Sequence, residues 1–285
     1  MRERRARTGA AALGRALIRK LQLAVPPGGG GVTILAYHLV GAATDSPVDL
    51  PEGVFRGQMA ELARRGSAIP LAALVDSIER RRPFDSHRVV VTFDDAYENF
   101  GRRVRPILAE LGIPATLFVP TDFVDRGRGG PLAGAADLPP MGWRELGALR
   151  EDGLVELGSH SRSHPDLRRL SDDDLAAELT GSAEVIERET GARPAAFCYP
   201  RALRSRRAEA AVARVYRAAV VGGGRTNDPR RAHTHRLERV SLRRDMPASL
   251  GEILDARVVL EEWLADRIRH LRRGGAGTPS AAATA

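Results

Sequence analysis

Residues 88–96 have the sequence RVVVTFDDA, in which an apolar run leads into two adjacent carboxylates, Asp94 and Asp95. A short apolar run of this kind predicts a strand over residues 89–93 that is buried on both faces, as in parallel sheets. Parallel strands need a crossover between them, and that crossover is usually a helix. The stretch therefore predicts an α/β fold with charged side chains at the end of one strand.

The same alternation continues on both sides of this stretch. Further strands are predicted at 32–37, 115–119, 155–158, 195–199, 218–221 and 239–242. Helices are predicted at 54–65, 71–82, 98–111, 143–151, 172–190 and 250–269, and Ser171 is a suitable N-cap for the helix at 172–190. About seven such repeats predict a distorted or incomplete (β/α) barrel, with a doubly wound open sheet as the alternative.

The chain divides into three parts by composition. Residues 1–27 form a basic amphipathic segment and linker that ends in Pro26-Pro27, residues 28–272 form the main domain, and residues 273–285 form a low-complexity tail that we expect to be disordered. Arg15 and Arg19 interrupt the apolar run near the N-terminus, so it lacks the h-region of a signal peptide. We expect a cytoplasmic protein whose N-terminal helix either lies on an anionic membrane surface or packs on the domain.

The overall composition excludes several classes of functional site. The 285 residues include one cysteine, Cys198, which excludes a disulfide framework and a cysteine-rich zinc site. A metal must therefore be held by histidines and carboxylates. The formal net charge of +8 comes with no recognised nucleic-acid-binding motif, so nucleic acid is not an expected partner.

Two further groups of polar residues follow predicted strands. Residues 158–165 read GSHSRSHP, and we expect His160 and His164, four apart, on one side of a helical turn where both imidazoles face one ion. With Asp95 they form a His₂-carboxylate set that leaves coordination positions open, and Asp94 is then a natural general base. The alternatives are a chance pair of surface histidines and a carboxylate that caps a helix.

The third group is FCYPRA at residues 197–202. A proline after a strand can hold a turn whose backbone N–H groups face an oxyanion. An ordinary strand exit is the alternative for this group taken alone.

These three groups, in this order, resemble the successive motifs of the polysaccharide deacetylases, also called carbohydrate esterase family four. The family shows Thr-Phe-Asp-Asp-Gly/Ala, then His-Ser/Thr-x-x-His-Pro, then an aromatic-containing segment that ends near Pro-x-Gly. Tyr37-His38 after the first strand resembles the segment that opens one branch of the family. The resemblance covers residues 32–242.

The resemblance implies a distorted (β/α) barrel, a divalent metal that is most often zinc, and hydrolysis of an N-acetyl group. Carried over by position, it implies the metal ligands Asp95, His160 and His164, the base Asp94, an oxyanion donor in the backbone N–H of Arg201, and His38 as a residue that lines the pocket or caps the first strand.

Three departures from the family pattern stand out. Ala202 takes the place where the family favours glycine, and Cys198 stands near the place of an arginine that orients the base in many relatives. The family's late catalytic acid is a histidine near the end of the barrel, and the candidates here, His233 and His235, lie in a polar loop. The identity of the catalytic acid stays open.

The sequence thus predicts a hydrolase that removes N-acetyl groups from N-acetylglucosamine-type sugars in a polysaccharide, oligosaccharide or lipid-linked glycan. One alternative is a catalytically weak relative that binds carbohydrate, although such a protein would not need Asp94 beside a metal. The other is a hydrolase of O-acetyl esters or non-sugar amides with the same fold. The exact substrate, the metal and the oligomeric state are not fixed by the sequence.

Overall fold

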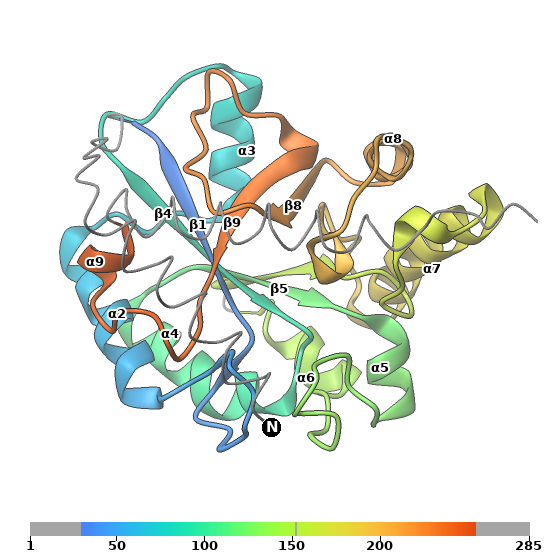
Figure 1. Cartoon of the computed structure of the whole chain (residues 1–285), viewed down its shortest axis with the longest axis horizontal. Coiled ribbons are helices and arrows are strands. Elements are labelled where there is room, and N and C mark those ends of the chain that lie inside the picture. The colour runs from blue at the N-terminus through green and yellow to red at the C-terminus, as the bar shows by residue number, and fades with distance from the viewer. Residues whose placement is uncertain (1–29, 152, 255–285) are drawn as a thin grey trace, which may run out of the picture.

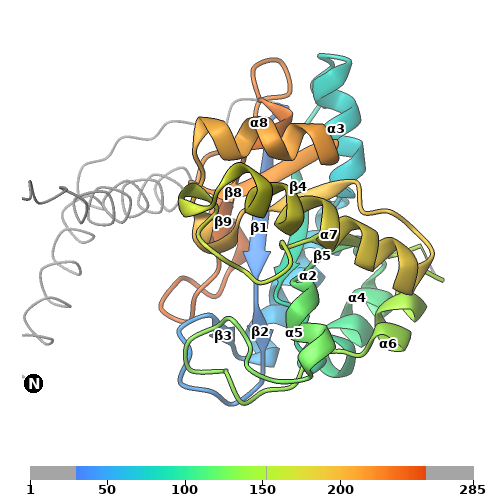
Figure 2. The same cartoon turned by 90° about the vertical axis from the view of Figure 1, so that its right-hand side faces the viewer.

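The computed structural model describes residues 30–151 and 153–254. In this part of the chain, seven parallel strands form a closed barrel in the order β1-β4-β5-β6-β7-β8-β9, ringed by helices (Figures 1 and 2). The strands are β1 (Val32–Tyr37), β4 (Arg88–Asp94), β5 (Ala115–Val119), β6 (Val155–Ser159), β7 (Ala196–Cys198), β8 (Ala218–Gly222) and β9 (Leu237–Ser241). The barrel closes because β1 pairs with both β4 and β9. The predicted barrel of seven repeats is confirmed, and the open doubly wound sheet is wrong.

The pairing around the barrel is uneven. Strand β1 is in register with β4 over its whole length, whereas β6 and β7 are joined only at Ser159 and Phe197. Gly158 lies at this narrow seam, where an added Cβ would come within 2.4 Å of the Phe118 ring and 3.1 Å of the Ala196 carbonyl oxygen. Only glycine lets β5, β6 and β7 approach so closely, and the close approach positions the chain that continues into His160.

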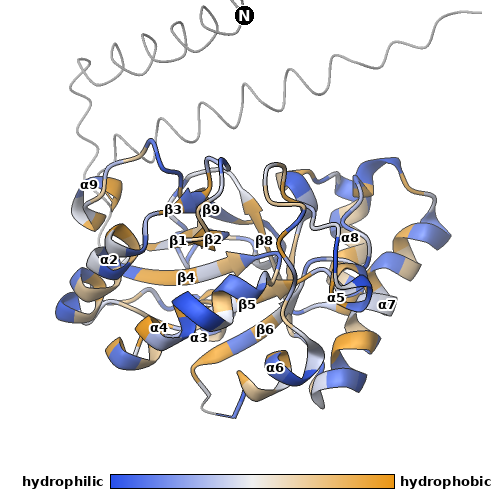
Figure 3. Cartoon of the chain, turned by 90° about the horizontal axis from the view of Figure 1, so that it is seen from below, coloured by the Kyte–Doolittle hydropathy of each residue, from blue (hydrophilic) through white to orange (hydrophobic). Residues whose placement is uncertain are grey.

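The helices cover the outside of the barrel. They are α2 (Glu52–Arg65), α3 (Leu71–Glu79), α4 (Arg105–Leu111), α5 (Thr121–Arg126), α6 (Trp143–Ala148), α7 (Asp172–Thr190), α8 (Arg206–Val215) and α9 (Leu250–Leu254). Coloured by hydropathy, the strands are largely hydrophobic and the exposed sides of the peripheral helices are largely hydrophilic (Figure 3). This is the pattern of a parallel barrel whose strands are buried on both faces.

Apolar side chains from alternate strand positions fill the interior of the barrel. Ile34, Val90 and Val220 belong to this inner cluster, and Leu71 and Leu74 of α3 pack against it. Helix α3 thereby covers the N-terminal end of the barrel, so chemistry is left to the opposite end, where the strands finish.

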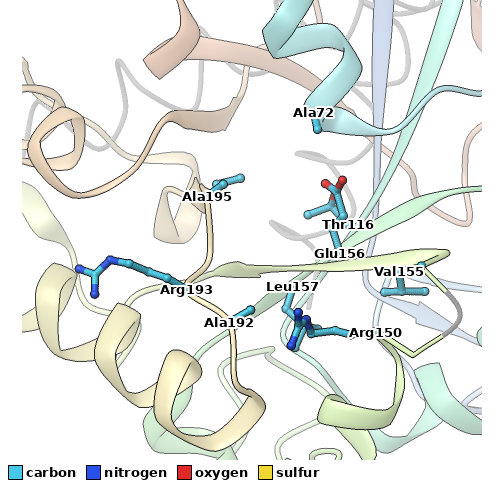
Figure 4. A pocket seen from close by; sticks show the side chains of 11 residues that line it. Ala72, Thr116, Arg150, Val155, Glu156, Leu157, Ala192, Arg193 and Ala195 are labelled. Carbon is cyan, nitrogen blue, oxygen red and sulfur yellow. The ribbon is translucent and has the colours of Figure 1, made fainter.

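A cavity of about 310 Å³ lies at the N-terminal ends of β5, β6 and β7 (Figure 4). Thr116 and Glu156 are register partners in neighbouring strands, and both line this cavity. Burial raises the pKa of the Glu156 carboxyl. No residue of the three sequence motifs lines this cavity.

The predicted elements are largely confirmed, with three differences. The helix expected at 98–111 is interrupted by a π-helical turn, Phe100–Val104, before α4. Helices α5 and α8 were not predicted, nor was the small parallel sheet of β2 (Leu39–Val40) and β3 (Asp49–Leu50). The helix expected at 250–269 is described only as far as α9.

Several predictions lie outside the described residues. They are the N-terminal segment 1–27, the tail 273–285 and the remainder of the C-terminal helix, and they stay predictions. Among residues 30–151 and 153–254, no helix is long and apolar enough to cross a membrane.

Candidate metal centre and active site

The three sequence motifs meet at the C-terminal end of the barrel. Asp94 is the last residue of β4, His160 directly follows β6, and Cys198 is the last residue of β7. A cavity of about 450 Å³ opens at this end. Every site residue predicted from the sequence lines it: His38, Asp94, Asp95, His160, His164 and Arg201. Apolar side chains such as Val48, Leu132 and Leu203 complete its wall.

Asp95, His160 and His164 form a compact group of metal-ligating side chains. One ligand atom from each lies within 4.8 Å of the other two, and Asp95 Oδ1 is 3.6 Å from His160 Nε2. The two imidazole rings lie 4.7 Å apart between centroids and are nearly perpendicular. Two imidazoles and one carboxylate at this separation can hold one divalent ion and leave positions open.

The ring orientation of His160 is set by the backbone of β7. His160 Nδ1 lies 2.9 Å from the carbonyl oxygen of Cys198, which can only accept a hydrogen bond. Nδ1 must therefore carry the proton, so the unprotonated Nε2 faces Asp95. A hydrogen bond of this kind from the second nitrogen is what fixes the tautomer of metal-ligating histidines.

The two histidines are brought together by an irregular loop, so the expected helical turn is wrong. Ser161 and His164 both have positive φ, 64° and 58°. Glu178 of α7 holds the loop from outside: its Oε2 accepts hydrogen bonds from the backbone N–H groups of Arg162 and Ser163, both at 2.9 Å. The loop therefore keeps its shape through contacts with α7 and not through helical hydrogen bonds of its own.

The Asp95 carboxylate suits a bound cation. Its Oδ1 is buried and accepts no hydrogen bond from the described residues. Burial, and then the charge of Asp94, raises the pKa of Asp95 well above its usual range. An unpartnered buried carboxylate oxygen is costly, and a cation bound there would offset that cost. The residues present therefore fit a divalent metal.

A second group of possible ligands overlaps the first. Asp94, His160 and Cys198 also place ligand atoms within 4.8 Å of one another. Burial raises the pKa of the Cys198 thiol well above its usual range, whereas a metal ligand must be the thiolate. Both Asp94 oxygens are already bonded to Arg239. The group with Asp95 is therefore the better site.

Asp94 is held by an arginine that the sequence motifs did not include. Arg239 of β9 donates to both carboxylate oxygens at 2.7 Å, Nη1 to Oδ1 and Nη2 to Oδ2. Arg239 Nη1 also donates to the Thr92 hydroxyl at 3.1 Å, and Nη2 contacts Cys198 Sγ at 2.9 Å. Burial alone would raise the pKa of Asp94, but the charge and hydrogen bonds of Arg239 outweigh it and hold that pKa well below its usual range. Asp94 is therefore ionised at neutral pH.

The position of Arg239 also explains why a cysteine can stand at position 198. The sequence places Cys198 near the position of an arginine that orients the base in many relatives. In this chain the guanidinium comes from β9, which only β8 separates from β7, and the small thiol leaves room for it. The signal in the sequence was a lone arginine at an inward position of the strand 237–241, two residues after the buried Leu237.

The third motif turns sharply after β7. Arg201 and Ala202 both have a φ of 57°. The N–H groups of Ala202 and Leu203 donate to the carbonyl oxygens of Tyr199 and Pro200, at 3.2 and 3.1 Å. Among the described residues, the Arg201 N–H has no such acceptor. Its N–H is thus available to a ligand, as an oxyanion donor requires.

The strain at this end of the barrel is concentrated in the three motifs. Among the described residues, eight non-glycine residues have positive φ, and six of them lie in the motifs: Asp95, Ala96, Ser161, His164, Arg201 and Ala202. Such conformations are costly and cluster where a site needs them. Position 202 does require positive φ, which explains why the family favours glycine there.

Three other histidines that the sequence suggested for the site separate into two groups. His38 lines the cavity, with Nε2 3.7 Å from Asp94 Oδ2. Burial is the main cause that lowers the pKa of His38 to about 4, so its imidazole is neutral at pH 7. His233 and His235 do not line the cavity; His235 Nε2 is hydrogen bonded to the Tyr216 carbonyl oxygen at 2.9 Å. The structure therefore does not bring either candidate for the catalytic acid, which the family supplies from a histidine near the end of the barrel, into the site.

Comparisons with known proteins agree with this arrangement. The family model described as polysaccharide deacetylase matches residues 81–219, which include all three motifs. Among curated proteins, an uncharacterized 30.6 kDa protein in the fumA 3' region of Geobacillus stearothermophilus is 27% identical over 113 residues. That match covers 39% of this chain and 37% of the relative, so the chain matches little more than a third of it.

Solved structures share the fold at low sequence identity. The Streptococcus pyogenes deacetylase PplD, in complex with acetate, superposes with a TM-score of 0.64 at 18% identity, covering 77% of this chain and 96% of that one. IcaB from Ammonifex degensii superposes with a TM-score of 0.62 at 18% identity, covering 82% of this chain and 97% of that one. At these identities the likeness establishes the barrel fold.

Proposed function

We propose that the chain, which matches the polysaccharide deacetylase family model over residues 81–219, is a metal-dependent hydrolase that removes N-acetyl groups from N-acetylglucosamine-type sugars. The substrate would be a polysaccharide, an oligosaccharide or a lipid-linked glycan. The observation that carries the proposal is the Asp95–His160–His164 group beside an Asp94 held by Arg239. A protein that only binds sugar has no use for an ionised carboxylate beside a metal site.

Zinc is the metal that we propose. Two imidazoles and a carboxylate are a common ligand set for a catalytic zinc, with the remaining positions left for water and substrate. Such an ion activates water and polarises the carbonyl of a bound substrate.

Residues of the chain itself would carry out the remaining steps of the reaction. Asp94 accepts the proton of the attacking water, and Arg239 keeps both of its oxygens in one orientation. The Arg201 N–H donates to the oxygen on which negative charge develops. Asp94 can then pass the proton it accepted to the departing amine. His38, 3.7 Å away, is the alternative carrier.

One experiment tests the metal and the reaction together. Wild-type protein is assayed for acetate release from acetylated chito-oligosaccharides as purified, after chelation, and after zinc is restored. We expect activity to be lost with the metal and recovered with it. His160→Ala and His164→Ala should each lose most of the bound metal, because a site with two protein ligands is poor. His87→Ala is the matched control, since His87 contacts Thr33 and lies outside the cavity.

The alternatives give different results in the same assay. Sugar binding without acetate release would indicate a carbohydrate-binding relative. Release from O-acetyl esters or non-sugar amides, but not from acetamido sugars, would indicate another hydrolase of the same fold. Full activity in metal-free protein, or full metal content in both histidine variants, would contradict the proposal.

A further inference from the structure

A smaller cavity of about 100 Å³ lies beside the candidate active site. It shares His164 and Arg201 with the main cavity, so a ligand that fills one extends naturally into the other. The side cavity is lined by three arginines, Arg126, Arg162 and Arg201, and by only one carboxylate, that of Asp122. The lining of the side cavity therefore carries more positive than negative charge.

Asp122 cannot neutralise this cluster. Its Oδ2 is 2.8 Å from Arg126 Nη2 and its Oδ1 is 3.0 Å from Arg162 Nε, so one carboxylate serves two guanidinium groups. In the part of the chain that the structure describes, the guanidinium of Arg201 forms no ion pair. Glu178 adds a second carboxylate from outside, through its bonds to the Arg162 and Ser163 N–H groups, so three guanidinium groups face two carboxylates and the side cavity keeps an excess of positive charge beside the main cavity.

A neutral sugar ring has no charged group with which such a cluster of arginines could pair. Arginine binds planar or tetrahedral oxyanions through paired hydrogen bonds, and carboxylates and phosphates fit this geometry. The small size of the side cavity suits one such group better than another sugar unit. Positive charges at the entrance to a cavity also attract an anionic substrate before it docks.

We infer that the substrate carries an anionic group, a phosphate or a carboxylate, next to the acetamido sugar, and that Arg126, Arg162 and Arg201 bind it. This inference rests on the proposed deacetylase function and specifies its substrate class. The shared chemistry is that of an oxyanion, and the two sources are separated by the choice of substrate in the assay.

The test compares three acetylated disaccharides that differ in one substituent. One is neutral di-N-acetylchitobiose, one carries a phosphate at its reducing end, and one has a uronic acid in place of the reducing sugar. We expect kcat/KM to be about tenfold higher for at least one anionic substrate than for the neutral one, the effect of one charge-assisted hydrogen bond. The preference should shrink in about 0.5 M salt, because these arginines are exposed to solvent and salt screens them.

Two variants should move this preference in opposite directions. Arg162→Gln removes a positive charge and should reduce the anionic preference, while Asp122→Asn removes a negative charge and should increase it. Both should leave kcat/KM for the neutral substrate close to wild type, since neither side chain lines the main cavity. Arg193→Gln is the control: Arg193 forms an exposed ion pair with Glu187 and lines the cavity at the other end of the barrel.

Equal kcat/KM for all three substrates, or a preference that neither Arg162→Gln nor Asp122→Asn changes, would overturn the inference. If none of the substrates releases acetate, the proposed function has failed. Calorimetry on the same three disaccharides then still tests whether the side cavity binds an anion. Tighter binding of an anionic disaccharide that weakens in Arg162→Gln would support the side cavity as an anion site. Equal binding of all three would overturn it.

Discussion

Arg239 and Asp94 form a two-point ion pair across the interior of the barrel, with 2.7 Å between each nitrogen and its carboxylate oxygen. Both side chains are almost completely buried, and they come from β9 and β4, far apart in the sequence. Neither charge could be buried without the other, because an unpaired ion in a protein interior costs several kcal/mol. This pair therefore fixes the orientation of the proposed base before any substrate arrives.

Replacing Arg239 should impair the reaction through Asp94. Arg239→Lys keeps the charge but cannot hold both oxygens at once. We expect kcat/KM for acetate release to fall by about 10–100-fold, the value of a lost hydrogen bond to a charged group. Without the two-point contact the pKa of Asp94 should rise, because burial then dominates. The acidic limb of the pH–rate profile should move to higher pH.

A purely structural role for Arg239 would lower stability without moving the pH profile. An unchanged profile in folded Arg239→Lys would therefore contradict the positioning role. Arg217→Lys is the matched control, because Arg217 pairs with Asp76 and Glu79 and does not line the site cavity.

Ala202→Gly should stabilise the protein. Ala202 has a φ of 57°, a conformation that costs an L-residue about 1–2 kcal/mol and glycine nothing. Glycine's greater freedom in the unfolded chain offsets part of this gain, so we expect the free energy of unfolding to rise by about 1 kcal/mol or less in urea titrations. Ala211→Gly, inside α8, is the control and should destabilise. A loss of stability in Ala202→Gly would show that the turn is not strained.

Glu156→Gln should stabilise the protein at neutral pH and not in acid. Burial raises the pKa of Glu156 in the folded state, so the folded protein holds this proton more tightly than the unfolded chain. The protonated form stabilises the fold at low pH, and this contribution is lost as the pH rises from the unfolded pKa through the folded one. Thermal unfolding of both proteins between about pH 4 and pH 8 measures the effect, since the usual glutamate pKa is about 4.3. A variant that is less stable at pH 8 would indicate that the Glu156 carboxylate is stabilised by a partner.

The order of elements could be predicted because each barrel strand is a short apolar run that ends in polar residues. The strand over Val32–Tyr37 and the helix over Asp172–Thr190 were predicted at their observed bounds. Helix α8 was missed although its two buried residues, Ala208 and Val212, lie four apart on one face, because the stretch is rich in alanine and arginine and holds few large apolar residues.

The candidate site could be predicted only in part. His160, His164 and Asp94-Asp95 follow strands directly, so their meeting at one end of the barrel follows from parallel pairing. Arg239 could not be assigned to Asp94, because that contact depends on the closure of the barrel, which places β9 beside β1 and therefore one strand away from β4. The loop that joins the two histidines takes its shape from Glu178, which the local sequence does not reveal.

The most direct test of the account is acetate release by Asp94→Asn. Asparagine keeps the size of the side chain but cannot accept the proton of the attacking water, and general-base catalysis is typically worth about 10²–10⁴ in rate. The variant must first be shown to be folded by circular dichroism, since Arg239 loses its charged partner. We predict a fall of that size in kcat with metal content unchanged, because Asp95, His160 and His164 are untouched. Acetate release close to the wild-type rate in folded, metal-loaded Asp94→Asn would contradict the account.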